Sequence, residues 1–365
     1  SALLDSSGRN ISQAVSIPIH LGCLTVLGKL LADTFPQGKA KAGDCYIIND
    51  PYSGGTHLPD IAIATPAFLN SKLIGYATVM IHHQDIGGMV PGSASVYAHD
   101  LYSEGLRLPL VKIIDQANLN DDLIGLMMSN SRTPHTLKGD LFAQIAAGSM
   151  GAKRMSELAN NYGLASLKDG INSLLDYTEK LTRAEIKKIP DGKYQFEDWV
   201  DNDGSLESIK PLKIAVEMTV KKSDIYFDFT GTSSQVKTAI NNVPSSATSA
   251  VMFGIRTLTG DASPDNEGGF RPVSIYFPKG SIVNPYFPAP VASRSVSLRR
   301  VVDVILGVLS KALPHKYPAA NCGQASVIYC GTTNELNNET IVGAIGGPWM
   351  GGMGARPNKD GIDAT

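Results

Sequence analysis

Apolar segments alternate with polar, glycine-rich loops in the first hundred residues. The apolar stretch 45–48 leads into a polar loop at 49–60, and a second apolar stretch follows at 61–64. Residues 73–81 are again rich in strand-forming side chains, and the polar sequence 82–88 comes directly after them. Each pattern predicts a strand bounded by a turn. We therefore expect both loops at the end of a sheet, where functional sites commonly gather.

Apolar side chains at helical spacing predict helices along the rest of the chain. The segment 20–35 carries one leucine-rich stripe and ends at Pro36. His20 stands just before that stripe, and we interpret it as a cap or packing residue in preference to a ligand. The other segments with this pattern are 121–128, 136–161, 167–189, 246–258 and 297–313. Gly139, Gly148 and Gly151 weaken the long helix unless another segment packs against them.

The order of these elements predicts an α+β fold. Polar and apolar residues alternate at 213–220 and again at 225–229, which is the pattern of a β-hairpin. The helices at 136–161 and 167–189 form either a helical hairpin over the sheet or a helical insertion between two halves. We expect mixed sheets with a helical hairpin, in two tightly packed parts, 1–190 and 191–365, and with no sustained βαβ alternation.

The two polar loops contain the residues best suited to bind a metal ion. His57 and Asp60 lie three apart in the first loop, and His82 ends the strand before the second. Imidazole and carboxylate ligands together suit zinc, manganese or iron, and three protein ligands plus water is the usual catalytic arrangement. The alternative is a hydrogen-bonded loop in which Asp50 caps a turn and the histidines are satisfied core groups.

Composition and charge exclude several classes of function. A net charge of −2 argues against a general nucleic-acid surface or an anionic-membrane surface. No apolar run is long enough to suggest a membrane span. The cysteines are too scattered for a metal motif or a disulfide framework, so we expect free thiols and a cytoplasmic protein; they are Cys23, Cys45, Cys322 and Cys330.

Nucleophilic catalysis and nucleotide binding find little support in the sequence. Ser53 and Ser93 lack the G-x-S-x-G elbow, and Cys45 sits inside an apolar strand. No phosphate loop of the form GxxxxGK[ST] occurs, so this chain is not expected to bind ATP. Three arginines at 294, 299 and 300 are candidates for an anionic substrate, although arginines on a helix are usually structural.

Motifs along nearly the whole chain resemble one known family, the hydantoinase B family. The first is Asn49-Asp50-Pro51-Tyr52 with Gly54-Gly55-Thr56-His57-Leu58-Pro59-Asp60, and the second is His82-His83-Gln84-Asp85-Ile86-Gly87-Gly88. Shorter matches follow at 91–93, 104–107, 138–144, 228–232, 270–273 and 351–356. The family includes B subunits of N-methylhydantoinases, part of 5-oxoprolinases, caprolactam-type lactamases, and subunits of acetone and acetophenone carboxylases.

The resemblance implies the metal-bearing B subunit of an ATP-dependent cyclic-amide hydrolase acting on a hydantoin, 5-oxoproline or a lactam. A hydantoinase A-type partner binds ATP and phosphorylates the amide, and a metal-activated water then attacks it. The metal would sit on His57, Asp60 and His82. His83 or Asp85 would orient the water or carry protons, and the residues expected to support the site are Asp50 and Glu104.

Two alternatives share these loops. One is a subunit of an ATP-dependent ketone carboxylase, and the other is a scaffold subunit without catalysis. The family also places an acidic ligand just before the position of Ser1, and we expect the chain to be a fragment of a longer subunit.

Overall fold

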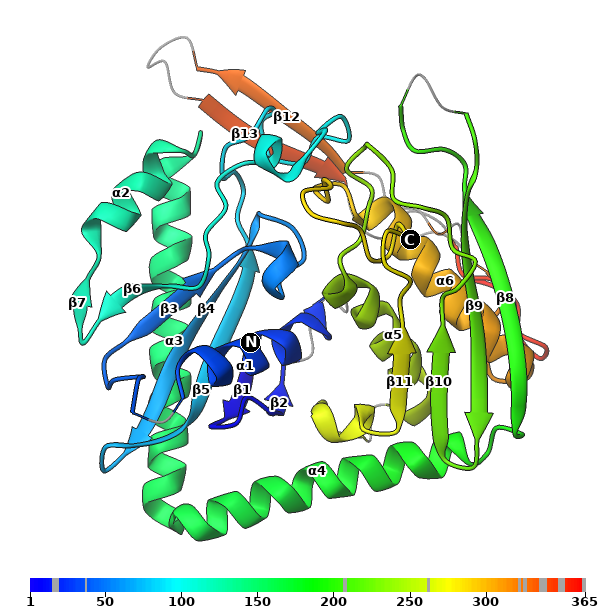
Figure 1. Cartoon of the computed structure of the whole chain (residues 1–365), viewed down its shortest axis with the longest axis horizontal. Coiled ribbons are helices and arrows are strands. Elements are labelled where there is room, and N and C mark those ends of the chain that lie inside the picture. Colours follow the sequence, from blue (N-terminus) through cyan, green and yellow to red (C-terminus); the bar gives the residue numbers. More distant parts are fainter. Residues whose placement is uncertain are drawn as a thin grey trace.

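The computed structural model describes residues 1–14, 20–36, 38–205, 209–260, 263–320, 323, 327–334, 340–346 and 352–362. In this part of the chain, a seven-stranded sheet and a four-stranded sheet form the centres of two halves that lie side by side (Figure 1). The mixed fold of helices and sheets that the sequence predicts is therefore confirmed. The predicted helices are all present, with ends moved by three residues or fewer.

The seven-stranded sheet is antiparallel throughout. Its order is β2-β1-β5-β4-β3-β6-β7. Its longest strands are the central pair β4 and β5, which carry the residues on either side of the two polar loops. The strands are β1 (Ala2–Asp5), β2 (Asn10–Gln13), β3 (Cys45–Ile48), β4 (Asp60–Leu69), β5 (Lys72–His82), β6 (Val111–Asp115) and β7 (Asn118–Leu119).

Helices cover both faces of this sheet. Because side chains alternate along a strand, Tyr46 and Ala62 pack with α1 (Cys23–Thr34) on one face. Ile47 packs with α3 (Pro134–Tyr162) on the other face. The strands are therefore buried on both sides, which explains why they read as continuous apolar runs.

The glycines of α3 are explained by its contact with the sheet. A Cβ atom on Gly148 would lie 2.7 Å from Oγ1 of Thr65, and one on Gly151 would lie 2.8 Å from Cβ of Ala77. The helix thus lies close to β4 and β5 only because these positions lack side chains. Gly139 has no such neighbour.

The two long helices do not fold back on each other as a hairpin over the sheet. Gly163 ends α3, and α4 (Leu164–Ile186) leaves in a new direction and runs beneath both halves to the second sheet (Figure 1). The reason is that their apolar faces have different partners. α3 packs on β4 and β5, whereas α4 packs on α5 and on the short helix η4 (Glu267–Phe270). These two helices thus take the alternative arrangement, a helical insertion between the two halves, in place of the expected hairpin.

The second half is built on a sheet with the order β11-β10-β9-β8. Helices α5 and α6 pack against one another, and α6 covers β8 and β9. The predicted hairpin is present as the antiparallel pair β9–β10, while β11 pairs with β10 in parallel. The elements are β8 (Gly192–Val200), β9 (Leu212–Lys221), β10 (Asp224–Asp228), α5 (Pro244–Thr259), β11 (Val273–Tyr276) and α6 (Ser295–Ala312).

Two short helices and a two-stranded ribbon lie outside the two main sheets. Helix α2 (Asp121–Ser129) precedes α3, and η3 (Leu101–Glu104) lies in the loop before β6. The glycine-rich end of the chain carries an antiparallel ribbon, β12 (Val327–Thr333) with β13 (Thr340–Gly346), which the sequence patterns do not predict.

Among the described residues, none of the helices is both long and apolar enough to cross a membrane. The two sheets lie on either side of residue 190, but many contacts join the halves, and the division into 1–190 and 191–365 stays a prediction.

Candidate metal centre

Asp60 and His82 are brought together by the register of two neighbouring strands. Asp60 begins β4, His82 ends β5, and the two residues are direct partners across the antiparallel pair. Side chains opposite each other on neighbouring strands point to the same face, which here is the α1 side. His83 comes one residue later and points to the α3 side, where its Nε2 lies 2.8 Å from Oε1 of Gln144.

His57 reaches the same place from the loop between β3 and β4. Asp50 caps the short helix η2 (Pro51–Ser53) by accepting a hydrogen bond of 3.0 Å from the N–H of Tyr52, so the capping role considered for Asp50 is what the structure shows. Nδ1 of His57 lies 3.1 Å from the carbonyl oxygen of Ala292, which only an N–H can satisfy. The lone pair of the ring is therefore on Nε2, which lies 3.3 Å from Oδ2 of Asp60.

The three predicted ligands form one cluster. One ligand atom from each of His57, Asp60 and His82 can be chosen so that all lie within 4.8 Å of one another. The ring centroids of the two histidines are 4.9 Å apart. His57 and Asp60 are buried, with 3% and 1% of their surfaces exposed, whereas His82 remains accessible. The cluster is thus formed by buried groups with one side open to an incoming ligand.

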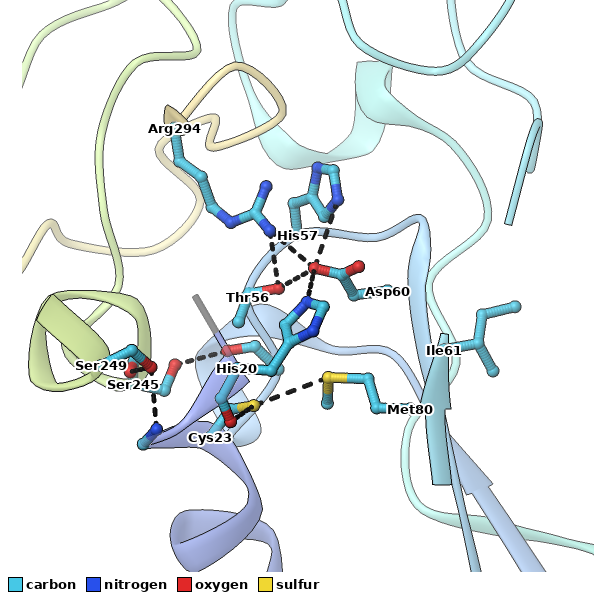
Figure 2. A network of polar contacts seen from close by, with 12 residues as sticks. His20, Cys23, Thr56, His57, Asp60, Ile61, Met80, Ser245, Ser249 and Arg294 are labelled. Atoms are coloured by element: carbon cyan, nitrogen blue, oxygen red, sulfur yellow. Dashed lines mark hydrogen bonds and ion pairs between the residues drawn. The ribbon is translucent and has the colours of Figure 1, made fainter. Parts of the chain in front are cut away.

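His20 also belongs to this cluster, which corrects its interpretation as a cap or packing residue. Its Nε2 lies 3.1 Å from Oδ2 of Asp60 (Figure 2). The residue stands just before α1, and α1 lies on the same face of the sheet as Asp60. The leucine stripe therefore does more than pack: it holds the start of the helix beside the carboxylate. Nothing in the local sequence distinguishes this role from a cap.

Arg294 is the contribution of the second half. Its Nη2 donates to Oδ2 of Asp60 at 2.6 Å and to Oγ1 of Thr56 at 3.1 Å (Figure 2). The hydroxyl of Thr56 in turn donates to the same carboxylate oxygen. Arg294 precedes α6 and is only 4% exposed. The carboxylate of Asp60 thus joins the two halves through a buried ion pair.

Unpartnered atoms test whether these residues fit a metal ion. Among the residues that the structure describes, Oδ1 of Asp60, Nε2 of His57 and Nε2 of His20 are buried without a hydrogen-bond partner. Buried polar atoms are nearly always hydrogen-bonded, so a group of three calls for an explanation. A lone pair on His57 that faces a carboxylate has no hydrogen between the two atoms, and a cation is what makes such a contact favourable. The donor set therefore fits a divalent ion.

The electrostatics keep these groups in the state that binds metals. Burial, with the nearby Arg294, lowers the pKa of His57 to about 3. Desolvation also lowers the pKa of His82. Burial alone would disfavour the charged form of Asp60, but the charged Arg294 beside it outweighs burial and holds the pKa of Asp60 well below the ordinary value. At neutral pH, His57 and His82 are therefore neutral imidazoles and Asp60 is a charged carboxylate.

Glu104 is linked to His57 through the backbone of one residue, Ala292. Its Oε1 accepts hydrogen bonds from the N–H groups of Val291 and Ala292, the second at 2.8 Å. The carbonyl of the same Ala292 accepts from His57. Burial raises the pKa of Glu104 to about 8. Its placement fits the supporting role expected from the sequence.

His83 and Asp85 have other partners. Asp85 accepts from the N–H groups of Gly87 and Gly92 at 2.9 and 3.0 Å, and from the backbone N–H and Nη1 of Arg132 at 2.9 and 3.0 Å. Within the described part of the chain, no hydrogen bond or ion pair connects His83 or Asp85 to the cluster. The structure brings together His57, Asp60 and His82, adds His20 and Arg294, and leaves these two outside.

The cysteines agree with the expectation of free thiols as far as they are described. Cys23 and Cys45 are buried, Cys330 is exposed, and all three are free. Cys322 lies outside the described residues. Burial raises the pKa of Cys45 to about 11, which fits a small packing residue and not a nucleophile.

Comparison with protein families gives a match over the whole chain. Residues 1–365 match the family described as Hydantoinase B/oxoprolinase. The B subunit of a putative D-/L-hydantoinase from Pseudomonas sp. (strain NS671) is 35% identical over 373 residues, which cover 100% of this chain and 61% of that protein. The beta subunit of the caprolactamase from Pseudomonas jessenii is 30% identical over 365 residues, covering 100% and 62%. The 5-oxoprolinase of Saccharomyces cerevisiae is 33% identical over 325 residues, covering 84% and 24%.

Solved structures show the same fold. The ATP-dependent caprolactamase from Pseudomonas jessenii superposes with a TM-score of 0.90 at 29% identity, over 100% of this chain and 62% of that one. A nucleotide-free acetone carboxylase superposes with a TM-score of 0.88 at 21% identity, over 100% and 50%, and at that identity the likeness concerns the fold alone. The chain thus spans about three fifths of the length of its bacterial relatives and about a quarter of the yeast one.

Proposed function

The chain belongs to the Hydantoinase B/oxoprolinase family, and from this premise we propose that it is the metal-bearing part of an ATP-dependent enzyme that hydrolyses cyclic amides. The observation that carries the proposal is the convergence of His57, Asp60 and His82, in which Nε2 of His57 and Oδ1 of Asp60 have no hydrogen-bond partner among the described residues. The candidate substrates are lactams, hydantoins and 5-oxoproline, because relatives are named as caprolactamase, hydantoinase and 5-oxoprolinase proteins.

His57, Asp60 and His82 would hold the ion, and zinc, manganese and iron all accept this set of ligands. Once bound, a divalent ion supplies Lewis acidity, which lowers the pKa of a water molecule toward ~7 and so provides a nucleophile at neutral pH. The carbonyl of Ala292 keeps the ring of His57 in the tautomer and orientation that point its lone pair at the site. Oδ1 of Asp60 is free for the ion, because its other contacts are all made through Oδ2.

The need for ATP follows from the chemistry of the substrate. An amide carbonyl is stabilised by resonance and its nitrogen leaves poorly, so water attacks it slowly. Phosphorylation of the amide oxygen weakens that resonance. Overall, one water opens the C–N bond and a second is consumed as the phosphoryl group ends as inorganic phosphate.

An A-type partner would bind the ATP. Two observations support this division of labour: the sequence has no GxxxxGK[ST] loop, and two relatives are named as one subunit of a larger enzyme. Glu104 is proposed as a positioning residue that acts on His57 through the peptide of Ala292. The contacts of His83 and Asp85 give no support to their roles with water or protons, and those of Asp50 indicate a turn cap.

A ketone carboxylase component is the second candidate, because the acetone carboxylase shares the fold. The experiment that separates the two is elemental analysis of the purified chain, followed by assays with the A-type partner and ATP. Lactams, hydantoins and 5-oxoproline test the first function, and ketones with bicarbonate test the second. We expect one divalent ion per chain and ring opening only when the partner is present. A chain without metal, or carboxylation without ring opening, would overturn the proposal.

Titration of ATP into the isolated chain tests the division of labour separately. No binding is expected at micromolar nucleotide, since the chain has no phosphate loop. Micromolar affinity in the isolated chain would show that the partner is not the ATP site.

A further inference from the structure

Arg294 is a buried cation beside the proposed metal centre, and it comes from the opposite half of the molecule. Resting on the proposed function, we propose that Arg294 forms, together with the bound ion, an anion subsite that takes the phosphoryl group of the activated substrate. A phosphoryl group carries negative charge and several acceptor oxygens, which a planar guanidinium matches better than any other side chain.

The charges of the cluster are the first argument. Asp60 and Arg294 form a buried ion pair, in which one negative charge is matched by one positive charge. These groups are therefore already balanced before an ion binds. A divalent ion then adds two positive charges to a buried place, where uncompensated charge is strongly unfavourable. An anion bound between the ion and Arg294 offsets this excess of positive charge.

The hydrogen bonds of Arg294 are the second argument. The contacts that hold it, to Asp60 and to Thr56, are both made through Nη2. Its Nε–H is buried and has no acceptor in the described part of the chain, although a guanidinium carries five donors. Arginines that serve only to neutralise a carboxylate commonly do so with two parallel hydrogen bonds. Here one nitrogen is used by the protein, and an unpaired buried donor remains for a ligand.

The position of Arg294 in the fold is the third argument. Its backbone is fixed by the turn into α6, where its N–H donates to the carbonyl of Val291 at 3.1 Å and its carbonyl accepts from the N–H of Leu298 at 2.9 Å. The metal ligands belong to the seven-stranded half. An anion held by both Arg294 and the ion would therefore bind at the junction of the halves, beside the open edge of the cluster at His82. The subsite is complete only when both halves are in place.

Binding of inorganic phosphate to the manganese-loaded chain tests the inference. Manganese is paramagnetic, so phosphate that binds next to it shows enhanced ³¹P relaxation. We expect Arg294→Lys to weaken phosphate binding by about tenfold or more, because the lysine keeps the charge beside Asp60 but loses the fork of donors. Arg300→Lys is the matched control: Arg300 lies on the same helix and pairs with Asp198 at 2.6 Å, and this variant should bind phosphate as the wild type does.

Other results of the phosphate and metal binding experiments would contradict the subsite or the metal centre. Equal phosphate binding in the wild type and Arg294→Lys would overturn the subsite and leave the metal centre standing. Failure of the wild type to bind manganese, zinc or iron would overturn the proposed function and the subsite with it. Acetate that binds as well as phosphate would show a carboxylate site instead. If Arg294→Lys does not fold, Thr56→Val replaces it, since this change removes one of the two groups that hold Nη2 and should weaken phosphate binding in the same direction.

Discussion

The two polar loops look like copies of one another in the sequence, yet their aspartates have opposite surroundings. Asp60 and Asp85 are both buried and both paired with an arginine, Arg294 at 2.6 Å and Arg132 at 3.0 Å. Asp85 accepts four hydrogen bonds that pin its own loop. Asp60 has one oxygen that finds no partner among the described residues, and the nearby Nε2 atoms of His57 and His20 are in the same condition. Satisfied hydrogen bonds indicate a structural role, and the unsatisfied group indicates a site for a ligand.

The largest expected effect is a loss of metal affinity when a proposed ligand in the loop of Asp60 is removed. His57→Ala and Asp60→Ala should each lower the metal affinity by more than about 100-fold, because loss of a direct ligand exceeds the 10- to 100-fold effect of supporting residues. Isothermal titration and elemental analysis measure this. Asp85→Ala is the control and should still bind the ion. Full metal occupancy in the first two variants would refute the assignment of the centre.

For the loop of Asp85, the comparison predicts that a substitution lowers stability and leaves metal binding intact. Asp85→Ala leaves Arg132 and two loop N–H groups without their acceptor, and we expect the free energy of unfolding to fall by roughly 3 kcal/mol. Denaturant unfolding of the metal-free chain gives the value. Asp224→Ala, which removes the exposed partner of Arg183, should cost less than about 1 kcal/mol. A similarly small effect at Asp85 would break the distinction between the two loops.

Glu104 extends the comparison to a group that supports the cluster. Its folded pKa is raised to about 8, above the ordinary value of 4.5. The folded state therefore keeps a proton that the unfolded state releases between these values, so this contribution to stability is full below pH 4.5 and is lost as the pH rises through 8. The free energy of unfolding should fall by about 1 kcal/mol per pH unit between pH 5 and 8.

Glu104→Gln, which cannot ionise, removes this dependence. Thermal or denaturant unfolding of the metal-free wild type and variant at pH 5 to 8 should therefore give curves that converge at the acidic end and separate toward pH 8. Parallel curves would show that Glu104 is charged throughout.

The smallest effect concerns the thiols on the two sides of the sheet. Cys23 lies on the α1 side, at the edge of the cluster, and burial raises its pKa to about 12; Cys45 lies on the α3 side and behaves alike. In the native protein, alkylation should label the exposed Cys330 first and both buried residues slowly. Mass spectrometry of the unreduced protein should show no disulfide between any two of its cysteines. A bond between two of them would contradict the expected reducing environment.

Local patterns were sufficient to predict the helices, the central strands and the three candidate ligands. The leucine stripe before Pro36 predicts α1, and the apolar runs beside the two polar loops predict β3, β4 and β5. The polar residues next to these runs include His57, Asp60 and His82. These features depend on spacing along a single segment, which backbone geometry turns directly into a face or a turn. His82 and His83 are neighbours in the sequence, and nothing there shows that only one of them faces the cluster. The register with Asp60 decides this, because side chains alternate along a strand and the two histidines point to opposite faces.

The sequence by itself determined the family, the helices, the central strands and the residues available to a metal ion. Only the tertiary structure decided which polar groups remain unsatisfied. Arg294 is 234 positions from Asp60, and His20 is 40 positions away, so no local pattern connects them to the carboxylate. Their approach depends on α1 packing on one face of the first sheet and on the second half docking against it. Burial and hydrogen-bond satisfaction are properties of that assembly, and they separate the loop that we propose to bind an ion from the loop whose aspartate is fully hydrogen-bonded.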